Sequence, residues 1–186
     1  MKKESLNEKN NLFVYIMLFF SLAFIGWCFE VLNEIRKGHG FINRGVLHGP
    51  WLPIYGFGGL IIYILLKKYY KKPIIVFSLS FIISAIIEYF TSFYLEITKG
   101  MVWWDYTKKP FNINGRICLL YTLIFALFAT ILYYFVIPKI IDLLKKLNYK
   151  TLSVISIILL SLYLVDNIYS YKKPNIVRGA HIVRKN

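Results

Sequence analysis

Three acidic residues lie within stretches that are otherwise apolar: Glu30, Glu88 and Asp166. An ionised carboxylate at the centre of a bilayer costs at least about 2.5 to 3.5 kcal/mol, so each needs a partner, a water-filled cavity or a position near the interface. Arginine is a good partner because its guanidinium stays charged and binds both carboxylate oxygens. Arg44 and Arg116 are the candidates. Such pairs could lock helices together or bind a solute or a proton, and the residue types leave both roles open.

Two motifs, at residues 43–56 and 103–106, add polar and aromatic side chains. Their tryptophans and tyrosines would suit an aromatic belt at the membrane interface, whereas Asp105 beside Trp104 favours an arginine partner or a cationic ligand. His48 could act as a general acid or base because imidazole titrates near neutral pH. We predict a binding site or polar vestibule formed by Glu30, Arg44, His48, Tyr55, Glu88, Trp104, Asp105, Asn112, Arg116 and Asp166.

The sequence contains none of the common motifs for the catalytic and metal sites considered next. A metal site on Glu34, His39 and His48 is an alternative that neither HExxH nor facial-triad spacing supports. No GxSxG elbow and no GxxxxGK[ST] phosphate loop occur, and Cys28 and Cys118 do not form a CxxC pair. We therefore predict no metal and no cofactor, assign no catalytic residue, and consider an enzyme the less favoured class.

The elements that must position these residues are apolar helices. Of the 186 residues, 58% are hydrophobic and 18% aromatic, more than a small soluble core holds. Stretches of about 20 apolar residues cross a bilayer as helices. We predict an all-α integral membrane protein, multi-pass in the cell membrane, with five transmembrane helices at about 12–32, 52–66, 73–96, 117–137 and 151–170.

One membrane domain, 12–170, would thus lie between a basic N-terminal segment, 1–11, and a basic C-terminal tail, 171–186. The 23 Lys and Arg residues form short clusters between the apolar runs, which is typical of loops flanking membrane spans and does not indicate nucleic-acid binding.

Five crossings divide the connections between two faces. Face A would hold the N-terminus and loops 67–72 and 138–150, and face B would hold loops 33–51 and 97–116 and the tail. The three acids in the spans then lie toward face B. Lysines and arginines are nearly equally numerous on both faces, so the positive-inside rule does not decide which face is cytoplasmic.

An internal repeat relates the first four spans. Residues 20–25 (FSLAFI) recur as 77–82 (FSLSFI), and each copy precedes, in the same order, two glutamates, a Lys-Gly pair and a cluster of Phe, Asn, Gly and Arg. The shared order predicts a parallel duplication of a two-helix hairpin. Chance matching of phenylalanine-rich spans is the alternative.

The most distinctive residues also resemble a known family. They are Gly26, Trp27 and Glu30, residues 43–47, Gly49 and Pro50, residues 53–56, Glu88 and Tyr89, residues 103–106, and residues 110–119. Over roughly residues 13–170 the chain is similar to the putative ABC transporter permeases of type IV, CmpB-like, which are small bacterial multi-pass membrane proteins. The resemblance implies a transport component, and the missing phosphate loop implies that any ATPase is a separate chain.

We expect a permease-like component with a polar Glu/Asp/Arg vestibule on one membrane face. The bilayer, a separate ATPase or other membrane subunit, and further copies of the chain are the expected partners, because five spans are few for a complete path. Two alternatives are an intramembrane enzyme acting on lipid head groups or lipid-linked intermediates, and a membrane assembly or scaffold protein.

Overall fold

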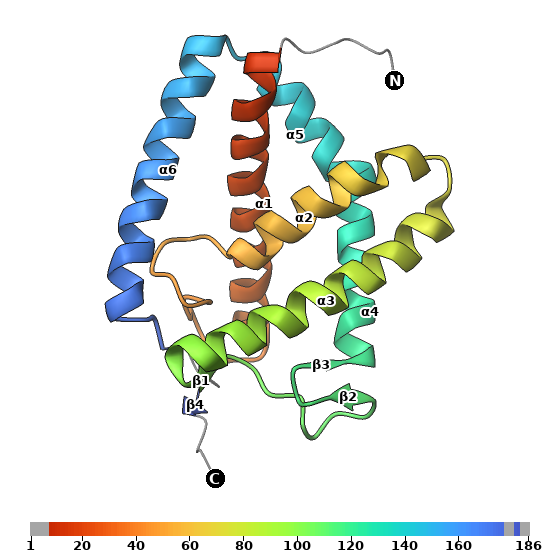
Figure 1. The fold of residues 1–186 in the computed structure, drawn as a ribbon, viewed down its shortest axis with the longest axis vertical. Coiled ribbons are helices and arrows are strands. Elements are labelled where there is room, and N and C mark those ends of the chain that lie inside the picture. The colour runs from red at the N-terminus through yellow and green to blue at the C-terminus, as the bar shows by residue number, and fades with distance from the viewer. Residues whose placement is uncertain (1–7, 177–180, 183–186) are drawn as a thin grey trace.

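The computed structural model describes residues 8–176 and 181–182, so parts of the predicted segments 1–11 and 171–186 lie outside it. The chain is mostly helical (Figure 1). Its elements in order are α1 (Glu8–Arg36), α2 (Pro53–Leu66), the short turn η1 (Lys67–Tyr69), α3 (Pro73–Lys99), β1 (Met101–Val102), β2 (Asn112–Ile113), β3 (Ile117–Cys118), α4 (Leu119–Ile131), the π-helical turn η2 (Leu132–Val136), α5 (Ile137–Leu144), α6 (Tyr149–Lys172) and β4 (His181–Ile182).

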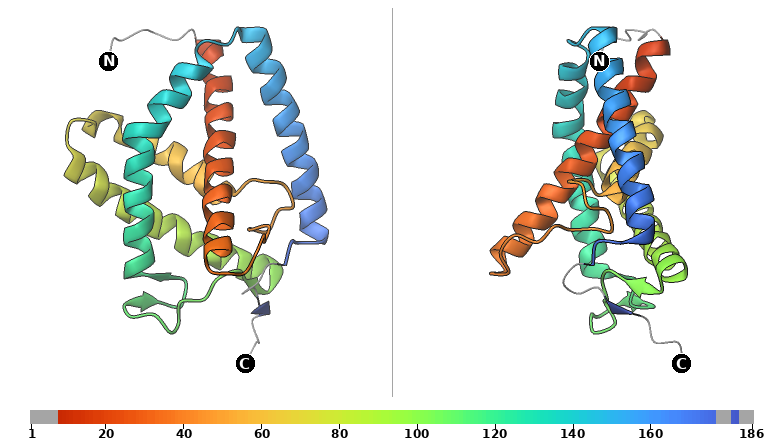
Figure 2. Two further views of the ribbon diagram at one scale, coloured as in Figure 1. Left: turned by 180° about the vertical axis from the view of Figure 1, so that it is seen from behind. Right: turned by 90° about the vertical axis from the view of Figure 1, so that its left-hand side faces the viewer.

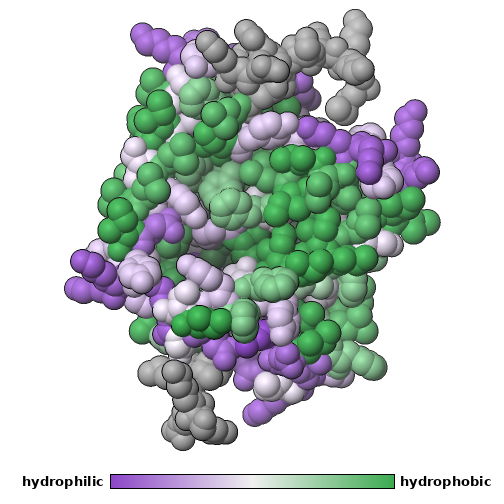
Figure 3. All heavy atoms as spheres, viewed as in Figure 1, coloured by the Kyte–Doolittle hydropathy of each residue, from purple (hydrophilic) through white to green (hydrophobic). Residues whose placement is uncertain are grey.

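Four helical stretches are long and apolar enough to cross a membrane: Leu12–Arg36, Pro73–Lys99, Leu119–Leu144 and Tyr149–Lys172. At 1.5 Å per residue, the 24 residues of α6 extend about 36 Å, enough for about 30 Å of hydrocarbon. A broad apolar surface lies between polar ends (Figure 3), and large apolar side chains of α3, α4 and α6 are exposed on it. These features agree with the predicted all-α membrane class.

The prediction of a full membrane span at 52–66 is wrong, because α2 is too short to cross the bilayer. Its 14 residues extend only about 21 Å. The amide of Leu52 donates to the carbonyl of Ala23, 3.0 Å away. Ala23 lies thirteen residues before the end of α1 at Arg36, so α2 begins about 20 Å from that end. The segment 37–52 must therefore fold back between α1 and α6 (Figure 2).

The third apolar stretch is one span built from three pieces. Helix α4 passes through η2 into α5, and Pro138 lies at the start of α5. Proline lacks an N–H and its ring collides with the carbonyl four residues earlier, so the helix widens into a π turn just before it. This long helix differs from the short α2, and the predicted duplication of a hairpin finds no support in the fold.

Helix α1 is the central element, and glycines let α2 approach it closely. A Cβ on Gly56 would lie 2.6 Å from the ring of Phe19, and one on Gly59 would lie 2.6 Å from Leu22. Small residues allow such backbone approach without a hydrophobic driving force between helices. On its other sides α1 packs its buried leucines against α5 and α6. Its lower end, which carries Glu30, is thereby held beside the start of α2.

Two short antiparallel pairs close the lower end of the molecule. Strand β2 pairs with β3, and β1 pairs with β4 near the C-terminus. The ends of α1, α3 and α6 lie on this side, whereas the connection from α5 to α6 lies at the opposite end (Figure 1). The lower end thus carries loops predicted for face B, and the opposite end carries the α5–α6 connection, which was predicted for face A (Figure 1).

Candidate functional site

A cavity of about 490 Å³ lies among α1, segment 37–52, α2, α3, α4, α6 and the start of loop 100–118. Apolar side chains of α2 and α4, such as Ile62, Phe125 and Phe128, form much of its wall. Five of the ten predicted site residues line it: Glu30, Arg44, Tyr55, Glu88 and Trp104. The other five lie elsewhere, as described below.

Glu30 is held at the cavity by residues of α2 and segment 37–52. The Tyr55 hydroxyl donates to Oε1 of Glu30 at 2.7 Å, and Nε of Arg44 lies 3.6 Å from Oε2. Gly26, one helical turn before Glu30, makes this possible because any Cβ there would collide with the Tyr55 ring. A glycine and a glutamate four residues apart on α1 thus form a socket for the first turn of α2.

Glu88, in α3, is the most buried acid of the cavity, with 3% of its surface exposed. Its Oε1 accepts a hydrogen bond of 3.1 Å from the Tyr106 hydroxyl. Its Oε2 is buried and has no hydrogen-bond partner among the described residues. Burial raises the pKa of Tyr106 well above its ordinary value, and the nearby charges of Glu88 and Glu30 raise it further. Tyr106 therefore remains a hydrogen-bond donor at any physiological pH.

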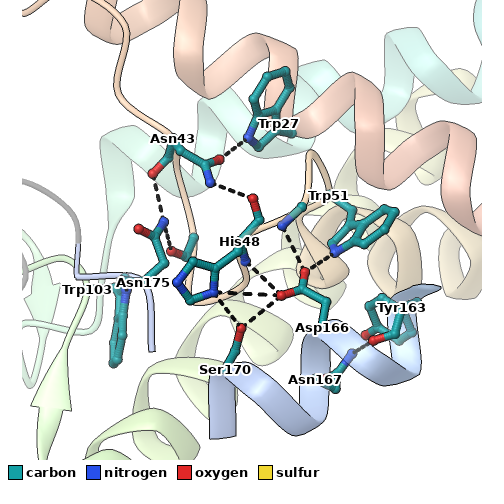
Figure 4. Close-up of polar contacts among 12 residues, drawn as sticks. Trp27, Asn43, His48, Trp51, Trp103, Tyr163, Asp166, Asn167, Ser170 and Asn175 are labelled. Atoms are coloured by element: carbon teal, nitrogen blue, oxygen red, sulfur yellow. Dashed lines mark hydrogen bonds and ion pairs between the residues drawn. The ribbon is translucent and has the colours of Figure 1, made fainter. Parts of the chain in front are cut away.

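Asp166, in α6, lies in a different cluster that anchors segment 37–52 (Figure 4). Its Oδ1 accepts from the amide of His48 at 3.0 Å and from the Ser170 hydroxyl at 2.9 Å. Its Oδ2 accepts from the amide of Gly49 and the indole of Trp51, both at 2.8 Å. Four donors satisfy this carboxylate, and the fold-back of the segment explains why its predicted place in the vestibule differs from its observed one.

The residues Ser170, His48 and Asp166 do not form a catalytic triad. Both Ser170 Oγ, at 2.9 Å, and Asp166 Oδ1, at 3.7 Å, lie against the same imidazole nitrogen, Nδ1. A triad instead places the serine and the acid on opposite ring nitrogens. Ser170 also donates its only proton to Asp166 and is 1% exposed, so this cluster holds a loop.

Arg116, Asp105 and Asn112 shape loop 100–118. Arg116 pairs with Glu96 of α3 at 2.5 Å, which differs from the predicted partners Glu30 and Glu88. Oδ1 of Asp105 accepts a hydrogen bond from the backbone amide of Thr107, which forms an Asx turn. Asn112 donates to two carbonyls of the same loop and accepts the amide of Gly115.

The alternative metal cluster is not assembled. Glu34 binds Lys37 and His39, each at 2.7 Å, while His48 lies against Asp166. Residues 8–176 and 181–182 contain no group of three or more His, Cys, Asp or Glu side chains that could hold a metal ion.

Asn175 joins the loops that border the cavity on face B. Its side chain donates to the carbonyls of Asn43 and Gly45, and its amide donates to Val46. Its own carbonyl accepts the indole of Trp103 at 3.1 Å. The start of the tail therefore ties segment 37–52 to loop 100–118.

Tyr106, Ser170 and Asn175 contribute to the site and its borders although they are not among the ten predicted residues. For Ser170 a signal existed, because it lies four residues after Asp166 and thus on the same face of a helix. For Tyr106 and Asn175 the sequence spacing does not indicate the partners. Irregular loops lie between Tyr106 and Glu88 and between Asn175 and Asn43.

The comparisons with known proteins give one match. A model of the family described as Putative ABC-transporter type IV matches residues 17–171, which is most of the chain. No curated protein and no solved structure gives a match.

Proposed function

We propose, since this chain belongs to the Putative ABC-transporter type IV family, that it is a permease-like membrane component that binds a small solute in the cavity containing Glu30 and Glu88. The protein is a multi-pass membrane protein with four helices that can cross the bilayer. The observation that carries the proposal is the cavity itself, in which two carboxylates lie among largely apolar walls. Ionisable groups at this depth are expensive and usually mark a binding site or a transport path.

The short helix α2 supports the same role. In many transporters a broken or half-length helix begins near the middle of the bilayer beside the substrate site. Here α2 begins beside Ala23, and its first turn supplies Tyr55 to the cavity. Irregular chain at this depth is tolerated where it packs against protein, and here Leu47 and Leu52 are buried and the amides of His48, Gly49 and Leu52 have hydrogen-bond partners.

Movement of this segment would give access to the cavity. Its two ties are the Asp166 cluster on α6 and Asn175 in the tail. Release of these ties would expose the cavity toward face B, and their formation would close it. Relative motion of the α1–α2 and α3–α4 hairpins, which the sequence repeat suggested, is the second element of the proposed mechanism.

The proposal includes partners and a location. A separate ATPase or another membrane subunit would supply energy, because the chain has no phosphate loop. A homo-oligomer would complete the path, since four crossings enclose little space. We place the complex in the cell membrane.

Metabolite profiling tests the transport role for many polar solutes at once. Cells that lack this protein are compared with cells expressing the wild type or Glu88→Gln, and polar solutes are measured inside and outside by mass spectrometry. We expect at least one solute to be redistributed in both the deletion and the Glu88→Gln strain. A scaffold would instead leave every solute unchanged with Glu88→Gln, provided that the variant reaches wild-type levels in the membrane.

A further inference from the structure

One oxygen of Glu88, Oε2, is buried beside the cavity without a hydrogen-bond donor among the described residues. Only 3% of Glu88 is exposed, and the residue lines the cavity. Tyr106 satisfies Oε1, but Oε2 accepts no hydrogen bond from the residues that the structure describes. A buried carboxylate oxygen without a donor is costly. A ligand that supplies positive charge there would remove that cost.

The cationic side chains lining the cavity are engaged with other groups. Arg44 lies against Glu30, so these two opposite charges largely offset each other. Lys99 donates to the carbonyl of Tyr171 and lies over its ring. It is also eleven residues beyond Glu88 on α3, about 16 Å along the helix. Glu88 has no ion pair with any described residue.

The remaining walls suit an organic cation better than a metal ion. A metal would need several oxygen, nitrogen or sulfur ligands, and no cluster of three His, Cys, Asp or Glu side chains occurs in the described part of the chain. The cavity instead offers aromatic rings, those of Tyr55, Tyr106, Trp103 and Trp104. Aromatic faces attract ammonium groups, most strongly where water is excluded. Its volume of about 490 Å³ also accommodates an organic molecule.

We propose that the solute is an organic cation whose ammonium group lies against Oε2 of Glu88, with its apolar part along the walls formed by α2 and α4. This inference rests on the proposed function, because it names the substrate class of the same cavity. Glu88 supplies the counter-charge, Tyr106 holds the carboxylate in place, and Glu30 with Arg44 remains a neutral pair.

Binding of choline to the purified protein tests this inference. The protein is purified in micelles of an uncharged maltoside detergent, which carries no ammonium group, and binding is measured by calorimetry and by tryptophan fluorescence. The neutral comparison ligand is 3,3-dimethylbutan-1-ol, which has the shape of choline with carbon in place of the charged nitrogen. We expect choline to bind at least about tenfold more tightly, a difference of about 1.4 kcal/mol.

The variant Glu88→Gln should abolish this preference, because it keeps the shape and removes the charge. Glu96→Gln is the matched control, since Glu96 is on the same helix but pairs with Arg116 outside the cavity. Thermal unfolding of both variants checks that they fold. Absence of choline binding, equal affinity for the neutral analogue, or full choline preference in Glu88→Gln would each overturn the inference.

The choline-binding experiment and the metabolite profile test separate claims. If a solute is redistributed in cells but choline does not bind, the transport role stands with a different substrate class. If choline binds through Glu88 but no solute is redistributed, the cavity is a cation site in a protein that does not transport.

Discussion

The acids of this protein differ in how completely their neighbours satisfy them. Asp166 accepts four hydrogen bonds, and Glu34 and Glu96 each pair with a basic side chain. Glu30 has one donor and one more distant arginine, and Glu88 has a single donor among the described residues. A fully satisfied carboxylate holds structure, whereas one with a free buried oxygen can bind a ligand. We therefore assign Asp166 to stability and Glu88 to binding.

Asp166→Asn should destabilise the protein. The new amide presents donors where an amide of segment 37–52 and the Trp51 indole also donate, so hydrogen bonds are lost inside the fold. We expect a loss of about 1 to 3 kcal/mol in the free energy of unfolding. Unfolding followed by tryptophan fluorescence measures it. Ser161→Ala, an exposed change on the same helix, is the control and should have little effect.

Equal free energies of unfolding for Asp166→Asn and Ser161→Ala would show that the Asp166 cluster does not anchor segment 37–52. A loss of choline binding by Asp166→Asn at unchanged stability would instead place this residue in the binding site, against our assignment.

Residue types were more predictable than their partners. The buried acids and Arg44 stand out because charge in an apolar run is rare, and five of ten predicted residues do line the cavity. The pairing of Arg116 with Glu96 and of Tyr106 with Glu88 depends on how loop 100–118 folds over the end of α3. Sequence spacing carries no information on that geometry.

At the scale of elements, α2 determines how the cavity forms. It starts at mid-depth, so its first turn reaches the carboxylate of Glu30 instead of the membrane surface. Three glycines, Gly26, Gly56 and Gly59, let it lie directly on α1. The socket for Tyr55 depends on the first of them.

Gly26→Ala should destabilise the protein and displace Tyr55 from Glu30. The new Cβ would overlap the Tyr55 ring, and overpacking of this kind costs about 1 to 3 kcal/mol. Gly58→Ala is the matched control, because its Cβ would lie 3.6 Å from Ile87, an ordinary contact, and alanine is the better helix former. The melting temperature of Gly26→Ala should be lower than that of the wild type. The melting temperature of Gly58→Ala should equal that of the wild type or exceed it. The reverse order would refute the close packing of α1 and α2.

The four crossing helices could be predicted from apolar length, but the depth of α2 could not. The apolar run 52–66 is shorter than the about 20 residues that a span needs, but its length does not say where in the bilayer the helix starts. The distinction depends on long-range contacts, namely the bond from Leu52 to Ala23 and the anchoring of His48 to Asp166. Glycines and prolines near residue 53 indicated an irregular helix without fixing where it starts.

For the whole molecule, we expect two faces with different roles. Face A carries short basic connections, whereas face B carries the loops that border the cavity. The apolar belt between them fits the bilayer (Figure 3).

Single cysteines test these faces in a background with Cys28 and Cys118 replaced by alanine. Lys71, Asn148 and Lys109 are exposed positions in three different connections. A membrane-impermeant thiol reagent should label cysteine at 71 and 148 from one side and at 109 from the other, because α3 crosses the bilayer. Labelling of 71 and 109 from the same side would contradict the arrangement.

A solute-accessible cavity beside Glu88 is best tested by the labelling rate of cysteine at position 91 against position 90. Thr91 lines the cavity, whereas its neighbour Phe90 is 61% exposed on the outer apolar surface. In membranes, the same impermeant reagent should react with Thr91→Cys from the face of Lys109, slow down when choline is present, and hardly react with Phe90→Cys. Reaction at 91 no faster than at 90, or no reaction at 91 from either side, would contradict a cavity that solutes enter selectively beside Glu88.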